Sequence, residues 1–136
     1  MNICGKIVEL LLWLLVTCAI ILVSLSPPAM VAPAIMRFGG DKIAHFAAYA
    51  ALGFITFLVF GSVFSSLRTQ LSRRYLVTVL YCAAVGGALE VLQPAFGRTF
   101  LVLDFFVDIA GGAAGALIAL GIVKTCFAVI VTHTKK

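Results

Sequence analysis

The chain has 136 residues, of which 63% are hydrophobic and 11% are charged, and its mean hydropathy is +1.20. A soluble domain of this length needs far more polar surface, so the composition excludes an ordinary water-soluble protein and indicates one domain surrounded by lipid. The formal net charge of +5 does not indicate nucleic-acid binding, because the basic residues stand singly or at segment ends and form no basic face among aromatic residues.

Four apolar segments are long enough to cross a bilayer as helices, which takes about 20 residues. The predicted helices span residues 7–26, 41–64, 75–93 and 101–124. Pro27 and Pro28 end the first helix and Pro94 ends the third, because proline lacks an N–H and disfavours helix in the residue before it. The fourth can continue through the following CFAVIV. Without an internal repeat or a long linker, we predict one all-α domain over residues 1–136, an integral membrane four-helix bundle.

The cysteines do not follow a metal-binding or disulfide pattern. Cys4 and Cys126 lie near the chain ends, Cys18 and Cys82 lie inside apolar runs, and there is no CxxC. A zinc site or a disulfide framework is therefore not expected, and these residues are interpreted as small apolar side chains.

The distribution of basic residues predicts the orientation, because cytoplasmic loops of membrane proteins carry an excess of Lys and Arg. Seven basic residues flank the chain ends and the second loop, namely Lys6, Arg68, Arg73, Arg74, Lys124, Lys135 and Lys136. The first and third loops hold three, namely Arg37, Lys42 and Arg98. We therefore expect both termini in the cytoplasm and the first and third loops outside.

Polar residues gather at the predicted outer ends of three helices. They are Asp41, Lys42, His45 and Tyr49 on the second helix, Glu90 and Gln93 on the third, Gly97 and Arg98 in the loop, and Asp104 and Asp108 on the fourth. Residues three or four apart share one face of a helix, so each helix presents a polar stripe. An ionised side chain at bilayer depth is costly unless it is paired or hydrated. We therefore predict that the stripes face a common interior cluster.

Small residues predict close approach of the helices. An alanine stripe on the second helix comprises Ala44, Ala47, Ala48 and Ala51. Gly111 and Gly115 form a GxxxG pair on the fourth helix, a pattern that lets two helices pack closely. The pair serves equally well within one chain or between two copies, so the oligomeric state is left open.

These motifs resemble those of the VanZ-like family of small multi-pass bacterial membrane proteins. The family carries Asp-Lys-x-x-His-x-x-x-Tyr on one helix, Glu-x-x-Gln on the next, Gly-Arg in the loop and Asp-x-x-x-Asn-x-x-Gly on the last. The segments DKIAHFAAYAALG, ALEVLQPAFGRTF and DFFVDIAGGAAG carry this pattern between residues 39 and 121. Two departures are Asp108 in place of the Asn and the lack of a proline directly before Gly97. Asp108 adds a negative charge. The site of this chain should therefore favour a more positively charged ligand than the sites of its relatives do.

The resemblance implies a protein of the bacterial cytoplasmic membrane, in the cell envelope. The family name implies a link to glycopeptide antibiotic resistance, chiefly to teicoplanin. That property belongs to the founding member, and likeness of fold does not transfer it. The resemblance implies no settled biochemical activity.

The residue types in the predicted cluster suit an envelope or lipid-linked phosphate substrate. Histidine titrates near neutral pH and serves as a general base, while Arg and Lys bind phosphate and carboxylates hold hard divalent cations. The candidate catalytic residues are His45, Glu90 and Asp104. The candidate substrate-binding residues are Lys42, Tyr49, Gln93 and Arg98. Asp41 and Asp108 are the candidate ligands of a divalent cation, the only cofactor that the residues suggest, and membrane lipids are the expected partners.

Two other functions compete with this interpretation, so enzymatic activity is left open. In a structural or accessory protein, the same side chains would form a buried network between helices, and Asp41 could simply cap its helix. An ion or proton pathway along the acidic residues is less favoured, because the second helix offers only Thr56 below Tyr49. A polar path that ends inside the membrane does not conduct.

Overall fold

The computed structural model describes residues 3–27, 29–30, 32–33 and 40–133. In chain order the helices are α1 (Ile3–Leu25), α3 (Asp41–Val63), α4 (Ser65–Arg68), α5 (Leu71–Leu92), the short 3₁₀ helix η1 (Gln93–Phe96) and α6 (Val102–His133). Within these residues, four stretches are long and apolar enough to cross a membrane, and these are α1, α3, α5 with η1, and the part of α6 up to Cys126. The predicted all-α fold with four such helices is confirmed.

Helix boundaries differ from the predicted ones where basic residues stand. The helix α5 begins at Leu71 rather than near residue 75, so Arg73 and Arg74 belong to the helix and not to a loop. Arginine is a good helix former with a long apolar stem, and its charge alone does not end a helix. The helix α6 continues to His133, past the predicted end at residue 124, as the apolar CFAVIV allows.

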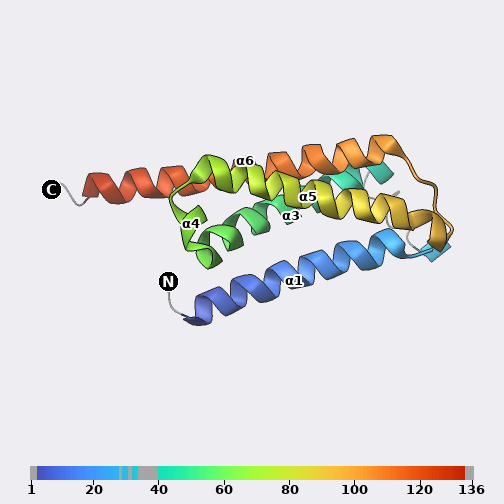
Figure 1. The fold of residues 1–136 in the computed structure, drawn as a ribbon, viewed down its shortest axis with the longest axis horizontal. Coiled ribbons are helices and arrows are strands. Elements are labelled where there is room, and N and C mark those ends of the chain that lie inside the picture. The colour runs from blue at the N-terminus through green and yellow to red at the C-terminus, as the bar shows by residue number, and fades with distance from the viewer. Residues whose placement is uncertain (1–2, 28, 31, 34–39, 134–136) are drawn as a thin grey trace.

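The helices α3, α5 and α6 form a compact group, and α1 lies along one side of it (Figure 1). The start of α1 and the end of α6 lie toward the same end of this bundle, and the C-terminal part of α6 extends beyond the ends of α3 and α5 (Figure 1). The starts of α3 and α6 and the end of α5 therefore meet at the opposite end. Motifs that lie far apart in the sequence are brought together there.

Glycines allow α3 and α6 to approach until their backbones touch. A Cβ added at Gly115 would overlap the backbone carbonyl of Ala50, and one added at Gly111 would overlap that of Phe46. A Cβ at Gly53 would likewise overlap the carbonyl of Gly112. The GxxxG pair therefore packs within the chain, the first of the two uses that the sequence left open.

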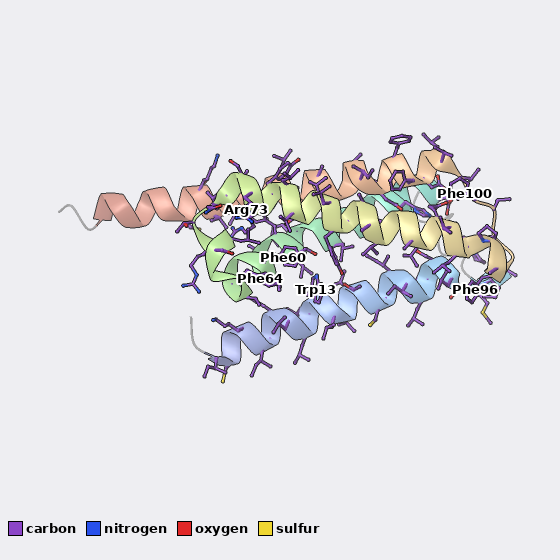
Figure 2. All side chains as sticks on the ribbon, viewed as in Figure 1. Trp13, Phe60, Phe64, Arg73, Phe96 and Phe100 are labelled. Carbon is purple, nitrogen blue, oxygen red and sulfur yellow. The ribbon has the colours of Figure 1, made fainter. Side chains whose placement is uncertain are left out.

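One aromatic residue of α1 contacts both α3 and α5. The Trp13 indole N–H donates a 3.0 Å hydrogen bond to the Thr56 hydroxyl, and its ring centroid lies 5.6 Å from that of Tyr81. Figure 2 shows Trp13 on the side of α1 that faces the other helices. Ile20 is the one residue that α1 buries within the described chain. Most of its apolar side chains are therefore left to contact lipid.

Candidate functional site

The polar side chains singled out in the sequence meet at the end of the bundle opposite the chain termini. We call this group the polar cluster, and it comprises Asp41, Lys42, His45, Tyr49, Glu90, Arg98, Asp104 and Asp108. Gln93 is buried at the start of η1, and its Nε2 has no hydrogen-bond partner among the described residues. The cluster joins α3, α5, α6 and the loop after η1, as the helical spacing predicts.

The outer half of the cluster consists of two ion pairs. Lys42 Nζ lies 3.0 Å from Asp104 Oδ1, and Arg98 Nη2 lies 3.5 Å from Asp41 Oδ1. The Lys42 side chain is 52% exposed, whereas the Asp104 side chain is 4% exposed. Asp41 does not cap its helix, because Gly40 holds the cap position and no side-chain cap bond forms. Each cation of the cluster thus has a carboxylate partner.

His45 connects the outer half to the buried half. Its Nδ1 lies 2.8 Å from Asp108 Oδ1, and its Nε2 lies 3.8 Å from Asp41 Oδ1. With a proton on Nδ1, the imidazole donates to Asp108 and leaves the Nε2 lone pair directed outward. Its side chain is 10% exposed, so it reaches the edge of the cluster without lying in open solvent.

The buried half of the cluster contains Glu90, Asp108 and Tyr49, each 1% exposed. Glu90 Oε2 accepts a 3.1 Å hydrogen bond from the Leu101 N–H, which fastens the loop that carries Arg98. Glu90 Oε1 and the Tyr49 hydroxyl have no hydrogen-bond partner in the described part of the chain. Buried polar atoms usually find a partner, so these two call for a ligand or a water.

The loop between α5 and α6 bends at Gly97. Its φ is 76°, in the left-handed region that glycine adopts at little cost. The Arg98 N–H donates a 3.2 Å hydrogen bond to the Gln93 carbonyl. The turn therefore directs Arg98 back over the cluster.

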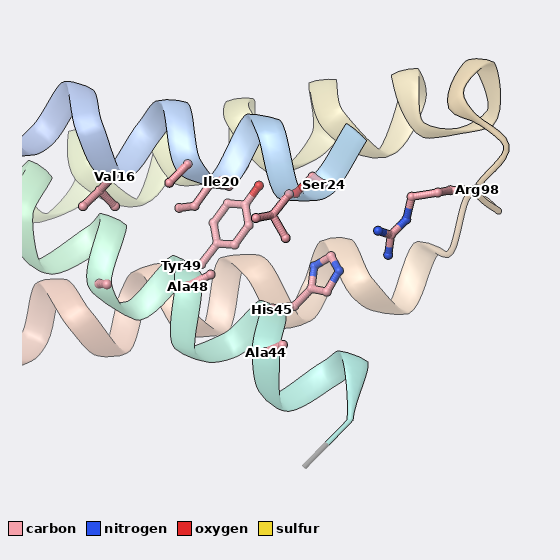
Figure 3. A pocket seen from close by; sticks show the side chains of 11 residues that line it. Val16, Ile20, Ser24, Ala44, His45, Ala48, Tyr49 and Arg98 are labelled. Atoms are coloured by element: carbon pink, nitrogen blue, oxygen red, sulfur yellow. The ribbon is translucent and has the colours of Figure 1, made fainter. Parts of the chain in front are cut away.

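A cavity of about 260 Å³ lies between α1 and α3 and ends at the polar cluster (Figure 3). Its walls are mainly apolar, with Val16 and Ile20 on α1. Figure 3 shows His45 and Arg98 toward one end of the cavity and Tyr49 along its side. The cavity thus combines an apolar slot with a polar end that carries His45 and Arg98.

The cavity adds residues that the sequence did not indicate. The alanine stripe of α3, predicted as a packing face, also contributes to the cavity wall through Ala44, Ala48 and Ala51. Their short side chains leave space between α3 and α1. The residues of α1 that line the cavity are apolar apart from Ser24, so the sequence did not mark them as part of a site.

Among the described side chains, two groups have donor atoms close enough together to hold a metal ion. One comprises Asp41, His45 and Asp104, and the other comprises His45, Glu90 and Asp108. Within each group the donor atoms lie within 4.8 Å of one another. Since both groups use His45, one ion at a time is the simplest occupancy.

A family model described as VanZ/LLP1 matches residues 5–124. The match includes the whole polar cluster and both helices that form the cavity for nearly all their length. Neither a curated protein nor a solved structure matches the chain. On this match and on its four helices of membrane-spanning length, the chain is a membrane protein that belongs to the VanZ/LLP1 family.

Proposed function

We propose that the chain binds a lipid-linked phosphate, with the apolar chain of the lipid between α1 and α3 and the phosphate at Arg98 and His45. The observation that carries the proposal is the unpaired arm of the Arg98 guanidinium at the end of an apolar cavity. Arg98 Nη1 is buried without a hydrogen-bond partner in the described residues, while Nη2 lies against Asp41.

The geometry of Arg98 suits an anion. A guanidinium presents its N–H groups in a planar fork that matches two oxygens of a phosphate. Asp41 fixes one side of this fork, and Nη1 on the other side has no hydrogen-bond partner among the described residues. The Lys42 ammonium is half exposed at the rim of the cluster, where it adds positive charge near an approaching headgroup. Both residues therefore keep their predicted substrate-binding role in the proposal.

The apolar walls supply the second half of the recognition. The cavity lies between α1 and α3, and α1 makes few buried contacts with the rest of the bundle. A lipid can therefore enter from the bilayer between these two helices. Burying its chain against Ile20 and Ala48 is favourable because dispersion contacts replace an unfilled space. A single hydrocarbon chain fits this slot better than a bulky soluble substrate.

His45 is the residue best placed to act on a bound phosphate. It lines the cavity, and an imidazole can accept or donate a proton near neutral pH. In the proposal Asp104 and Glu90 support the site indirectly. Asp104 pairs with Lys42, and Glu90 accepts a hydrogen bond from the loop that carries Arg98. The Tyr49 ring forms part of the cavity wall. Binding is therefore the core of the proposal, with His45 as the candidate for any proton transfer.

A structural or accessory role is the second candidate, and one observation favours it. Both cations of the polar cluster already have carboxylate partners, and His45 is bonded to Asp108. Such a network could simply join the three helices. A purely structural network would not require the unpartnered Nη1 of Arg98 or the cavity beside it.

Binding of a polyprenyl phosphate by the purified protein in dodecyl maltoside tests the proposal. The matched control is the corresponding polyprenol, and native mass spectrometry measures both. We expect the phosphate to bind more tightly than the alcohol. Arg98→Ala should weaken phosphate binding by about tenfold or more, since hydrogen bonds to charged groups contribute about 1.5–3 kcal/mol. Ala48→Leu should fill the cavity and weaken binding, whereas Ala47→Leu, on the exposed face, should not.

Thermal unfolding of the same variants separates the two candidates. If the wild-type protein binds the phosphate no better than the alcohol and Arg98→Ala unfolds, the network is structural, because Arg98 then contributes to folding and not to ligand binding. If Arg98→Ala remains folded and loses only the phosphate, the binding site is supported.

A further inference from the structure

We propose that the buried half of the polar cluster binds one divalent cation through Glu90, Asp108 and His45. This site lies on the opposite side of the imidazole from the ion pairs of the outer half. It does not require the lipid phosphate of the proposed function, although His45 borders both sites. The argument rests on charge balance, on donor geometry and on buried polar atoms without partners.

Charge balance divides the cluster into two unequal halves. In the outer half, Lys42 and Arg98 compensate Asp104 and Asp41. In the buried half, neither Glu90 nor Asp108 has a Lys or Arg nitrogen within 4.0 Å among the described side chains.

If Glu90 and Asp108 are both ionised, a protonated His45 compensates only one of them, so at least one negative charge is left uncompensated. Intramembrane charges are normally paired because burying them alone is costly. One divalent cation would balance the pair of Glu90 and Asp108.

The donor atoms are spaced as ligands of one ion. Those of Glu90, Asp108 and His45 lie within 4.8 Å of one another, and His45 Nδ1 is 2.8 Å from Asp108 Oδ1. Two ligand atoms at ~2.1 Å from a metal and at right angles are roughly 3 Å apart. The outer group meets the same distance limit. Its carboxylates are already paired, Asp104 with Lys42 and Asp41 with Arg98.

Unpartnered atoms at the same place form an independent observation. Tyr49 is 1% exposed, and its hydroxyl has no partner within hydrogen-bond distance in the described chain, although it lies near enough to Asp108 to interact with that carboxylate. It lies next to Asp108, because a Cβ added at Gly86 would stand 2.9 Å from Asp108 Oδ2 and 3.4 Å from the Tyr49 ring. Glu90 Oε1 is equally unpartnered. An ion with its remaining water would supply partners for both oxygens.

The donor set indicates the class of metal. One imidazole nitrogen with two carboxylates suits Mn²⁺ or Zn²⁺ better than Ca²⁺, which takes six to eight oxygen ligands. The sequence suggested Asp41 and Asp108 as cation ligands. This proposal keeps Asp108 and replaces Asp41, which pairs with Arg98, by Glu90 and His45.

Manganese binding to the metal-stripped protein tests the inference. The protein is treated with EDTA, exchanged into phosphate-free dodecyl maltoside and titrated with MnCl₂ under electron paramagnetic resonance. We expect one Mn²⁺ per chain, with the nitrogen coupling of a single imidazole in the pulsed spectrum. Glu90→Gln and Asp108→Asn should each weaken Mn²⁺ binding by more than about tenfold, since even outer-shell changes at metal sites cost 10- to 100-fold.

Two carboxylate variants serve as controls. Asp104→Asn, in the outer group, and Glu9→Gln, on α1, should retain Mn²⁺ binding with its nitrogen coupling. A folded wild-type protein that binds neither Mn²⁺ nor Zn²⁺ would overturn the inference. So would bound Mn²⁺ without nitrogen coupling, or binding that Asp104→Asn abolishes and Glu90→Gln leaves intact.

Lipid binding in EDTA keeps this test apart from that of the proposed function. Polyprenyl phosphate that still binds through Arg98 while Mn²⁺ does not bind would refute the cation site alone. Mn²⁺ that binds with its nitrogen coupling, while the phosphate does not bind, would refute the lipid-phosphate proposal and support the cation site.

Discussion

Arg74 is a buried cation that has no carboxylate partner among the described residues. It is 4% exposed, and its guanidinium carbon stands 3.9 Å from the centroid of the Phe57 ring. Its Nε and Nη2 have no hydrogen-bond partner in the part of the chain described here. Gly61 makes room for this group, because a Cβ there would overlap Nη1. The sequence analysis instead counted Arg74 among the basic residues that flank the second loop.

Replacing Arg74 with methionine should leave the free energy of unfolding unchanged or raise it. The substitution removes donors whose lack of partners costs about 1–3 kcal/mol, and methionine fills a similar space. The loss of the cation–π contact with Phe57 lowers the free energy of unfolding by about 0.5–2 kcal/mol, which offsets this gain. Reversible unfolding in mixed detergent measures the change, with Arg73→Met at an exposed site of the same helix as the control. A loss above about 2 kcal/mol at Arg74 alone would show that the guanidinium has a stabilising partner.

Spacing along each helix predicted which polar side chains share a face, but not how they pair between helices. Asp41 and His45 are four residues apart and do approach to 3.8 Å. The partners of Lys42 and His45 on α6 depend on how far α6 slides along α3. Nothing in the spacing of Asp104 and Asp108 sets that register. It arises from backbone contacts at glycines, which the hydropathy pattern does not encode.

At the level of the helices, the packing of α3 against α6 sets the register of the whole site. Gly111 and Gly115 place α6 against the backbone of α3, and Gly112 faces Cys82 on α5. Small residues are the usual means of close helix approach in lipid, where no hydrophobic effect drives the helices together. The same contacts place Asp104 and Asp108 opposite Lys42 and His45.

An added methyl group at Gly115 should therefore separate these two helices. A Cβ there would overlap the Ala50 carbonyl, whereas one at Gly121, six residues further along α6, meets open space. We expect Gly115→Ala to lower the free energy of unfolding by about 1–3 kcal/mol through overpacking. Gly121→Ala should raise it by about 0.5–1 kcal/mol through helix propensity. Unfolding in mixed detergent compares the two, and equal effects at both positions would contradict this packing.

At the level of the whole molecule, composition was enough to predict four membrane-spanning helices, because long apolar runs have few other stable structures in lipid. It could not predict the cavity. An apolar residue of α1 looks the same in the sequence whether it faces lipid or the cavity. Only the position of α1 beside α3 in the structure distinguishes Ile20 from its neighbours. The polar cluster was predictable because charged residues in an apolar segment are rare and stand out.

Charge is unevenly divided between the two ends of the bundle. At the end with the termini, Arg68, Arg73 and Lys124 are exposed. At the other end, Lys42 and Arg98 are paired with carboxylates. The residues Arg37, Lys135 and Lys136, which also entered the orientation count, lie outside the described residues. The free positive charge of the described chain thus lies at the end predicted to face the cytoplasm.

This distribution predicts that the loop carrying Arg98 faces outward and the loop between α4 and α5 faces the cytoplasm, as the positive-inside rule requires. Thr99 and Thr69 are exposed positions in these two loops. In a background without native cysteines, Thr99→Cys should react with a membrane-impermeant maleimide in intact cells. Thr69→Cys should react only after the membrane is opened. Labelling of Thr69→Cys in intact cells, with Thr99→Cys protected, would reverse the orientation. The polar cluster would then face the cytoplasm, and its lipid phosphate would have to come from the inner leaflet.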